Sequence, residues 1–184
     1  MAKIFKSEGL SVIFIILSLI GLIFKSALPY NLVTAAFMHS SFDHWLNNCM
    51  LFAILSPFVE RSYGKAVYLL GFAWTCLVNF LYMKMSGQYG IGLSAFVFAL
   101  FMLATFANTK MLISICGIFV IITYGGQELW ASKNADGIGH MHHFIGMLSG
   151  ATFGLIVVFI KKKISKEETT MNDFNIEDQK DEMV

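Results

Sequence analysis

Residues 143–163, whose sequence is HFIGMLSGATFGLIVVFIKKK, decide the fold of this chain. The run is apolar over most of its length and ends in three consecutive lysines. Gly146, Gly150 and Gly154 recur at every fourth position, so in a helix they fall roughly on one face together with His143. Small residues at this spacing let two helices approach closely in a membrane. The stretch therefore predicts a membrane-spanning helix with a histidine near one end.

The composition of the whole chain agrees with a membrane protein. Of the 184 residues, 57% are hydrophobic and 14% are charged, with a mean hydropathy of +0.67. An average soluble domain is about 25% charged. The net charge of +1 gives no indication of nucleic-acid binding. Cys49, Cys76 and Cys116 lie far apart in apolar runs, which favours buried free thiols over a disulfide or a metal site.

Six segments are candidates for spanning a bilayer, which takes about 20 mostly apolar residues in a helix. Their approximate bounds are residues 10–28, 44–59, 65–83, 91–107, 111–124 and 139–160. We therefore expect an all-α membrane protein with six transmembrane helices, the first of them a retained helix rather than a signal peptide. Residues 1–9 would be an N-terminal cytoplasmic flank, residues 10–163 the membrane domain and residues 164–184 an acidic, disordered cytoplasmic tail.

Basic residues near the predicted helix ends indicate the orientation. With six spans and both termini in the cytoplasm, more of these residues lie on the inner side, as the positive-inside rule requires. The inner set is Lys3, Lys6, Arg61, Lys65, Lys110, Lys161, Lys162, Lys163 and Lys166, and the outer set is Lys25, Lys84 and Lys133. We expect an integral protein of the plasma (inner) membrane of a prokaryote.

Four uncommon polar residues then lie at a similar depth, near the outer face. His44, Asn48, Ser94 and His143 each fall near the start of the second, fourth or sixth segment. Polar groups in lipid are costly, so an intramembrane cluster of them indicates a functional site. His44 and Asn48 are one helical turn apart, and both can donate a hydrogen bond to a negatively charged oxygen.

Ser94 and His143 could together carry nucleophilic chemistry. Ser94 lies in the first turn of its predicted helix, where backbone N–H groups lack partners within the helix. A serine hydroxyl is a weak nucleophile until a neighbouring base takes its proton, and His143 could be that base. Ala95 and Ala99 offer a small-residue stripe against which the glycines of the sixth segment could pack.

Each feature also has a purely structural interpretation. Ser94 alone could be a helix cap or part of a hydrogen bond between helices. The histidines His140, His142 and His143 could bind a metal, although no cysteine or acidic residue lies at a familiar ligand spacing. Sequence spacing alone leaves these alternatives open.

Taken together, the motifs resemble the rhomboid family of intramembrane serine proteases. The resemblance covers most of residues 37–154 and includes four motifs in the family's order. These are Phe37-Met38-His39 with His44-x-x-x-Asn48, Glu60-Arg61-x-Tyr63-Gly64, Gly92-Leu93-Ser94-Ala95, and His143-x-x-Gly146-x-x-x-Gly150. The third is similar to the family's Gly-x-Ser-Gly, with Ala95 in place of the commoner glycine.

The resemblance implies a protease that needs no cofactor or metal. It would cut a peptide bond in or near the transmembrane segment of a single-span or polytopic membrane protein, with its active site toward the outer face of the lipid bilayer. Ser94 would be the nucleophile and His143 the general base and acid, forming a dyad without a third acid. His44, Asn48 and the Ser94 backbone N–H would stabilise the oxyanion. Supporting roles would fall to Gly92, Phe98, Gly146 and Gly150.

Besides Ala95, two further departures from the family's pattern bear on this expectation. Phe98 stands where many members have a tyrosine beneath the histidine, and the loop after the first helix lacks their Trp-Arg pair. The alternatives are a catalytically inactive rhomboid-like protein that binds membrane clients and, less favoured, a small transporter that uses the histidines. In the protease, the fifth segment and the loop Gly125–Gly139 are candidates for a gate.

Overall fold

The computed structural model describes residues 9–90, 92–107, 111–133 and 139–181. In these ranges the chain forms seven helices and no strand, which confirms the all-α fold class for the part described. The helices are α2 (Gly9–Ile23), α3 (Thr34–Phe37), α4 (Phe42–Tyr63), α5 (Lys65–Ser86), α6 (Ser94–Ala107), α7 (Met111–Ala131) and α8 (His140–Asp181). Several predictions concern residues that the structure does not describe. These are most of the N-terminal flank, Ile91, residues 108–110 and 134–138, and the side chain of Cys116.

The six longer helices follow the order of the six predicted segments, with differences at their ends. The predicted break from Gly125 onward is wrong over its first half, because α7 continues to Ala131. The helix continues through Gly125, where an added Cβ would lie 3.0 Å from the Met147 Cε of α8. The first predicted segment ends earlier, at Ile23, and the four-residue helix α3 was not predicted.

The helices present apolar surface suited to lipid. Two helical stretches, Lys65–Ser86 and His140–Glu167, are long and apolar enough to cross a membrane, and α2 and α6 are shorter apolar helices. Large side chains on α2 point outward, with Ile16 52% and Ile23 62% exposed. Extensive exposed apolar surface of this kind is typical of helices that contact lipid. The six-span count and the cytoplasmic location of both termini remain predictions.

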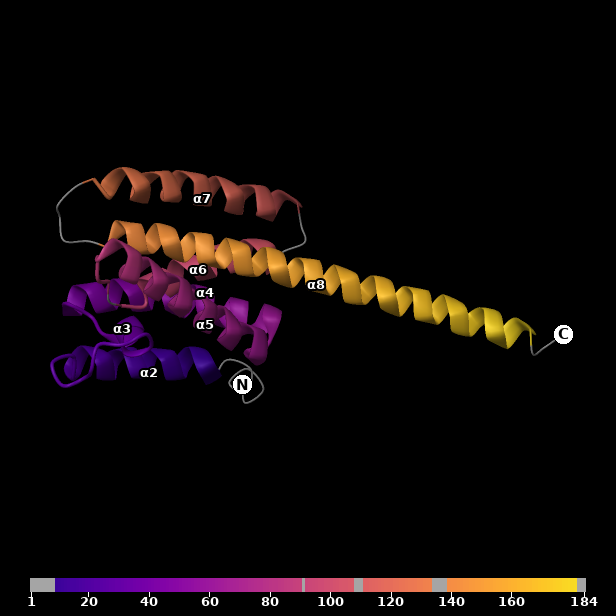
Figure 1. Cartoon of the computed structure of the whole chain (residues 1–184), viewed down its shortest axis with the longest axis horizontal. Helices are drawn as coiled ribbons and strands as arrows, with labels where there is room; N and C mark the ends of the chain where they lie inside the picture. The colour runs from indigo at the N-terminus through magenta and orange to yellow at the C-terminus, as the bar shows by residue number, and fades with distance from the viewer. Residues whose placement is uncertain (1–8, 91, 108–110, 134–138, 182–184) are drawn as a thin grey trace.

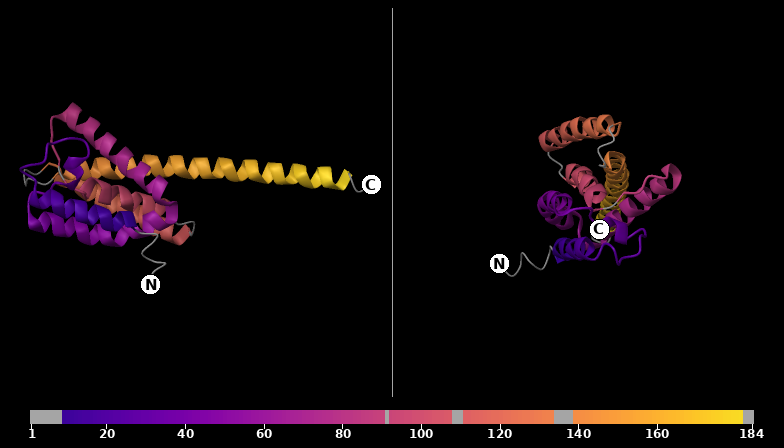
Figure 2. Two further views of the ribbon diagram at one scale, coloured as in Figure 1. Left: turned by 90° about the horizontal axis from the view of Figure 1, so that it is seen from below. Right: turned by 90° about the vertical axis from the view of Figure 1, so that its left-hand side faces the viewer.

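Helix α6 lies at the centre of the bundle and contacts α3, α4, α5, α7 and α8. Its two ends therefore lie among other helices, and most of its side chains are buried. Helix α7 lies at the edge of the bundle, where its main contacts in the described part of the chain are with α6 and α8. Figure 1 and the right-hand view of Figure 2 show it apart from α2 to α5. A site built on α6 is therefore surrounded by other helices.

An aromatic cluster packs the helices on the other side of α6. Phe14 of α2 contacts Phe72 of α5 with ring centroids 4.7 Å apart, and Phe72 contacts Phe96 of α6 at 5.0 Å. Edge-to-face pairs of this kind add about 0.5–1.5 kcal/mol beyond the area they bury. Cys49 and Cys76 are buried free thiols near this region, as predicted.

The C-terminal part of α8 differs from the prediction. Residues from 164 onward were expected to be disordered, whereas the structure continues the helix to Asp181, well beyond the bundle (Figure 1). No glycine or proline follows Gly154 to interrupt the helix. Lys163 and Glu167 also form an i,i+4 ion pair with an N–O distance of 3.9 Å, which favours helix modestly.

Candidate active site

The segment before Ser94 is tied to α3 and to the turn that follows it. The Gly92 N–H donates to the Ala35 carbonyl oxygen at 2.8 Å. The Leu93 N–H donates weakly to the His39 Nε2 at 3.4 Å. Burial lowers the pKa of His39 to about 4, so its ring is neutral and Nε2 can accept this bond. These contacts hold the backbone immediately before Ser94, the first residue of α6, in place.

Gly92 meets two requirements that only glycine satisfies. Its φ angle is +107°, in a region that side chains disfavour. An added Cβ would also lie 3.2 Å from the His44 Nε2 and 3.3 Å from the Asn48 Nδ2. The close approach brings the polar ends of both α4 side chains against the backbone two residues before Ser94.

Local contacts fix the start of α4 and orient the His44 ring, whereas the Asn48 amide nitrogen lacks a partner in the described residues. Ser41 caps α4 by accepting the His44 N–H at 3.2 Å, and the Ser40 Oγ lies 3.0 Å from the His44 Nδ1. When the Ser40 hydroxyl donates to Nδ1, the ring carries its proton on Nε2, on the side of Gly92. The Asn48 Nδ2 is buried and has no hydrogen-bond partner within the described residues. A buried amide donor without an acceptor is uncommon and suits a site that binds an oxygen.

Helices α6 and α8 touch along the predicted small-residue stripe. A Cβ added at Gly146 would overlap the Ala95 carbonyl oxygen, and one at Gly150 would overlap the Ala99 carbonyl oxygen. The two backbones are therefore in direct contact, as the glycine spacing predicted. Gly154 departs from this pattern, because a Cβ there would meet the Phe106 ring.

His143 lies above the face of α6 that begins with Ser94. Its ring stacks on Phe98, with centroids 4.5 Å apart and planes 10° from parallel. Phe98 is four residues after Ser94, so both lie on one face of α6. Ser94 is buried, with 6% of its surface exposed, and its hydroxyl makes no hydrogen bond to the His143 ring in the described part of the chain. Stacking and helix contact thus bring the serine and the histidine to neighbouring positions without joining them.

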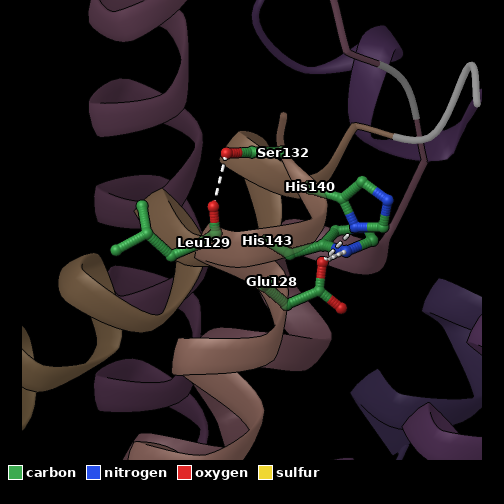
Figure 3. A network of polar contacts seen from close by, with 5 residues as sticks. All are labelled: Glu128, Leu129, Ser132, His140 and His143. Carbon is green, nitrogen blue, oxygen red and sulfur yellow. Dashed lines mark hydrogen bonds and ion pairs between the residues drawn. The ribbon is translucent and has the colours of Figure 1, made fainter. Parts of the chain in front are cut away.

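An acidic side chain contacts His143, although the sequence offered no obvious acidic partner for it; the dyad itself stays a prediction. The Glu128 Oε2 of α7 lies 3.0 Å from the His143 Nδ1 and 2.6 Å from the His140 Nδ1 (Figure 3). All three groups are largely buried, with side-chain exposures of 11% for Glu128, 14% for His143 and 10% for His140. The described residues thus hold a carboxylate that accepts from two imidazoles.

Sequence reasoning missed Glu128 because it lies in the stretch interpreted as a loop. One signal could have found it: Glu128 is the only acidic residue between Glu60 and Asp136. A single carboxylate within an apolar membrane domain is costly unless another group pairs with it. The histidines at positions 140, 142 and 143 were the nearest candidates in the sequence.

The same three side chains could ligate a cation, since their ligand atoms lie within 4.8 Å of one another. Glutamate and two histidines are a donor set that zinc accepts. The distances of 2.6 and 3.0 Å from one carboxylate oxygen to the two ring nitrogens are, however, those of direct hydrogen bonds.

A pocket adjoins Ser94 between α5, α6 and the start of α8. Apolar side chains, including Cys76, Phe80 and Met83, form much of its lining, with Asn79 and His142 as polar members. The Asn79 Oδ1 lies 3.3 Å from the His142 Nδ1. Ser94 is itself one of the residues that line the pocket.

The chain matches known proteins over most of its length. A family profile described as Rhomboid domain matches residues 26–160. The chain is 25% identical over 148 residues to "Putative rhomboid protease YdcA" of Bacillus subtilis (strain 168), an alignment that covers 73% of this chain and 70% of that protein. No solved structure matches this chain. With the helical bundle and the motifs in family order, the chain belongs to the rhomboid family of integral membrane proteins, whose members are generally intramembrane serine proteases.

Proposed function

We propose that this protein is an intramembrane serine protease that hydrolyses a peptide bond in or near the transmembrane segment of a membrane protein, single-span or polytopic. Membership of the rhomboid family supports the reaction class. The observation that carries the assignment to this chain is the meeting of His44 and the unpartnered Asn48 amide at Gly92, next to Ser94. A buried amide donor with no acceptor among the described residues, next to an imidazole and beside a serine at a helix start, suits an oxyanion site.

The proposed reaction uses one serine and one histidine for both half-reactions. The Ser94 Oγ attacks the scissile carbonyl carbon while its proton passes to the His143 Nε2. The tetrahedral intermediate then collapses, the C–N bond breaks, and His143 returns the proton to the leaving amine. A water molecule, deprotonated by His143, hydrolyses the acyl ester and regenerates the serine.

Negative charge on the carbonyl oxygen is the main cost of each step. The Ser94 backbone N–H belongs to the first turn of α6, where no carbonyl of the same helix accepts it. His44 and Asn48 complete the donor set from α4. One such donor is worth about 2.7–4 kcal/mol of transition-state stabilisation in a serine protease.

The pocket beside Ser94 supports binding of the substrate side chain next to the cut. Its lining is mainly apolar, with Asn79 and His142 able to contact a small polar group. The shared depth of the site residues near one end of the bundle supports access from the outer face of a prokaryotic plasma membrane. On this proposal residues 10–163 are the catalytic membrane domain, with six spans and both termini cytoplasmic.

The test is cleavage of a single-span reporter by the purified full-length chain in lipid vesicles. We expect Ser94→Ala and His143→Ala each to lower cleavage by at least about 1,000-fold. Ser62→Ala is the matched control, because Ser62 is exposed at the far end of α4. Cleavage by either site variant at the wild-type rate would contradict the dyad. A fluorophosphonate probe that fails to label Ser94 would favour the inactive, client-binding alternative.

A further inference from the structure

We infer that Glu128 is a positioning residue for the proposed reaction, so that the site is a Ser–His–Glu triad of Ser94, His143 and Glu128. The inference rests on the proposed function, because it assigns Glu128 a role through His143. Its basis is the 3.0 Å contact between the Glu128 Oε2 and the His143 Nδ1 (Figure 3).

The contact selects one tautomer of the neutral histidine. A carboxylate can only accept, so the hydrogen bond requires the proton of His143 to be on Nδ1. The lone pair then lies on Nε2, on the opposite side of the ring from Glu128. That is the nitrogen a base needs to take the serine proton. Without the carboxylate, the ring could carry its proton on Nε2 and would not act as a base.

Two contacts together hold the ring in one orientation. Stacking on Phe98 sets the plane of the His143 ring, and the bond to Glu128 sets its rotation within that plane. The two contacts come from different helices, α6 and α7. After proton transfer the ring is a cation, and the adjacent negative carboxylate stabilises it.

His140 stabilises the buried carboxylate of Glu128. Glu128 is 8% exposed, and an ionised carboxylate at such a site is costly unless it is hydrogen-bonded. The same oxygen accepts from the His140 Nδ1 at 2.6 Å, so two donors compensate the charge. His140 therefore holds Glu128, which in turn holds His143.

A structural metal is the competing interpretation of the cluster. A tetrahedral zinc site needs ligand distances near 2.1 Å, which keeps neighbouring ligand atoms at about 3.4 Å. The 2.6 Å separation of the Glu128 Oε2 and the His140 Nδ1 is shorter than this and leaves no space for an ion between them. The geometry thus favours proton sharing over metal binding.

The test compares Glu128→Gln and Glu128→Asp with the wild type, using reporter cleavage in vesicles. We expect Glu128→Gln to lower kcat about 100-fold with KM within about twofold, because the amide carries no charge to stabilise the imidazolium. Glu128→Asp should recover at least tenfold of that loss by restoring the charge. Glu167→Gln is the matched control, because the Glu167 carboxylate is 62% exposed on α8, far from the histidines, and its loss should keep the wild-type rate.

A spectroscopic measurement keeps the inference testable if the variants fold poorly. In the full-length wild type labelled with ¹⁵N-histidine, the His143 resonances, assigned by their loss in His143→Gln, should show a proton on Nδ1. A proton on Nε2, or a kcat of Glu128→Gln within twofold of the wild type, would overturn the inference. Stoichiometric zinc in purified wild type that is lost in Glu128→Gln would overturn it as well, by making the carboxylate a metal ligand.

Failure of the inference can be told apart from failure of the proposed function. If Ser94→Ala and His143→Ala abolish cleavage while Glu128→Gln does not affect it, the dyad stands and the triad fails. If Ser94→Ala cleaves at the wild-type rate, the proposed function itself fails.

Discussion

Phe98 and His143 lie face to face, with ring centroids 4.5 Å apart and planes 10° from parallel. Phe98 is buried in α6, where it also lies 5.9 Å from the Tyr124 ring of α7. The His143 ring thus stacks on a phenylalanine of α6 that also contacts α7. Because Phe98 has no hydroxyl group, it can support His143 only by packing and ring stacking.

Substitutions of Phe98 should separate the effect of ring stacking from that of the hydrogen bond that a tyrosine would add. We expect Phe98→Leu to lower kcat about fivefold to tenfold and the free energy of unfolding by about 1 kcal/mol, through loss of the ring contact. Phe98→Tyr should stay within about threefold of wild-type activity, since it keeps the ring. Reporter cleavage and thermal unfolding in detergent measure the two effects.

The control for this series is Phe159→Leu, because Phe159 is 70% exposed on α8, far from the histidine. It should leave cleavage unchanged. A Phe98→Leu variant as active as Phe159→Leu would show that the stacked ring does not orient His143.

The α6–α8 contact depends on the absence of a side chain at Gly146. We expect Gly146→Ala to lower both stability and cleavage, because its Cβ would overlap backbone atoms of Ala95 and force the helices apart next to Ser94. Overpacking of this kind typically costs about 1–3 kcal/mol. Unfolding temperature and reporter cleavage are the measurements.

In contrast to Gly146→Ala, Gly126→Ala on the neighbouring helix α7 should raise the stability. Nothing lies within 4 Å of a Cβ added at Gly126, which is exposed on α7. Alanine favours helix over glycine by about 0.5–1 kcal/mol, so this variant should be slightly more stable. Equal effects of the two substitutions would mean that the close contact at Gly146 is unimportant.

The helices and their main contact follow from local patterns. Apolar length predicted the six longer helices, and the four-residue glycine spacing predicted the contact of Gly146 and Gly150 with α6. Both are properties of neighbouring residues on one helix, so one sequence suffices to find them. The same reasoning placed His143 near Ser94, because each lies near the start of a helix in that contact.

What the sequence missed depends on contacts between segments. Glu128 lies on α7 and contacts His143 on α8, so no pattern within one helix reveals the pair. The adjacent glycines Gly125 and Gly126 also made this segment resemble a loop. Whether such a pair breaks a helix depends on its surroundings in the fold, and here α7 continues through both glycines. The bond from Leu93 to His39 likewise joins positions 54 residues apart, beyond the reach of any periodicity.

A buried carboxylate holds the start of α2, far from the candidate site. Glu60 is 1% exposed and accepts from the Ser11 N–H at 3.0 Å and the Ser11 Oγ at 2.7 Å. We expect Glu60→Gln to lower the free energy of unfolding by about 1–3 kcal/mol, because an amide leaves a buried N–H without its acceptor. Thermal unfolding in detergent measures the loss.

Cleavage per folded molecule should stay near the wild-type value in Glu60→Gln, which marks the role as structural. Glu167→Gln is the matched control, since Glu167 is 62% exposed and pairs with Lys163 on the surface of α8. That change should alter stability by less than about 0.5 kcal/mol. Equal stability of the two variants would contradict the anchoring role of Glu60.

The unpartnered Asn48 amide gives the sharpest test of the oxyanion site. Asn48 is 7% exposed, and its Nδ2 finds no acceptor in the described part of the chain, although it lies against Gly92. If that donor binds the developing oxyanion, Asn48→Ala should lower kcat about 100-fold and leave KM nearly unchanged, since the interaction forms only in the transition state. Removing a donor that has no ground-state partner should also cost little stability.

Asn47→Ala separates this effect from a general disturbance of α4. Asn47 is the adjacent residue but is exposed on another face of the helix, so its replacement should leave kcat unchanged. His44→Ala should resemble Asn48→Ala in kcat, and the double variant should lose less than the product of the two single losses if both donors serve one oxygen. A KM increase with normal kcat in Asn48→Ala would instead assign the amide to substrate binding.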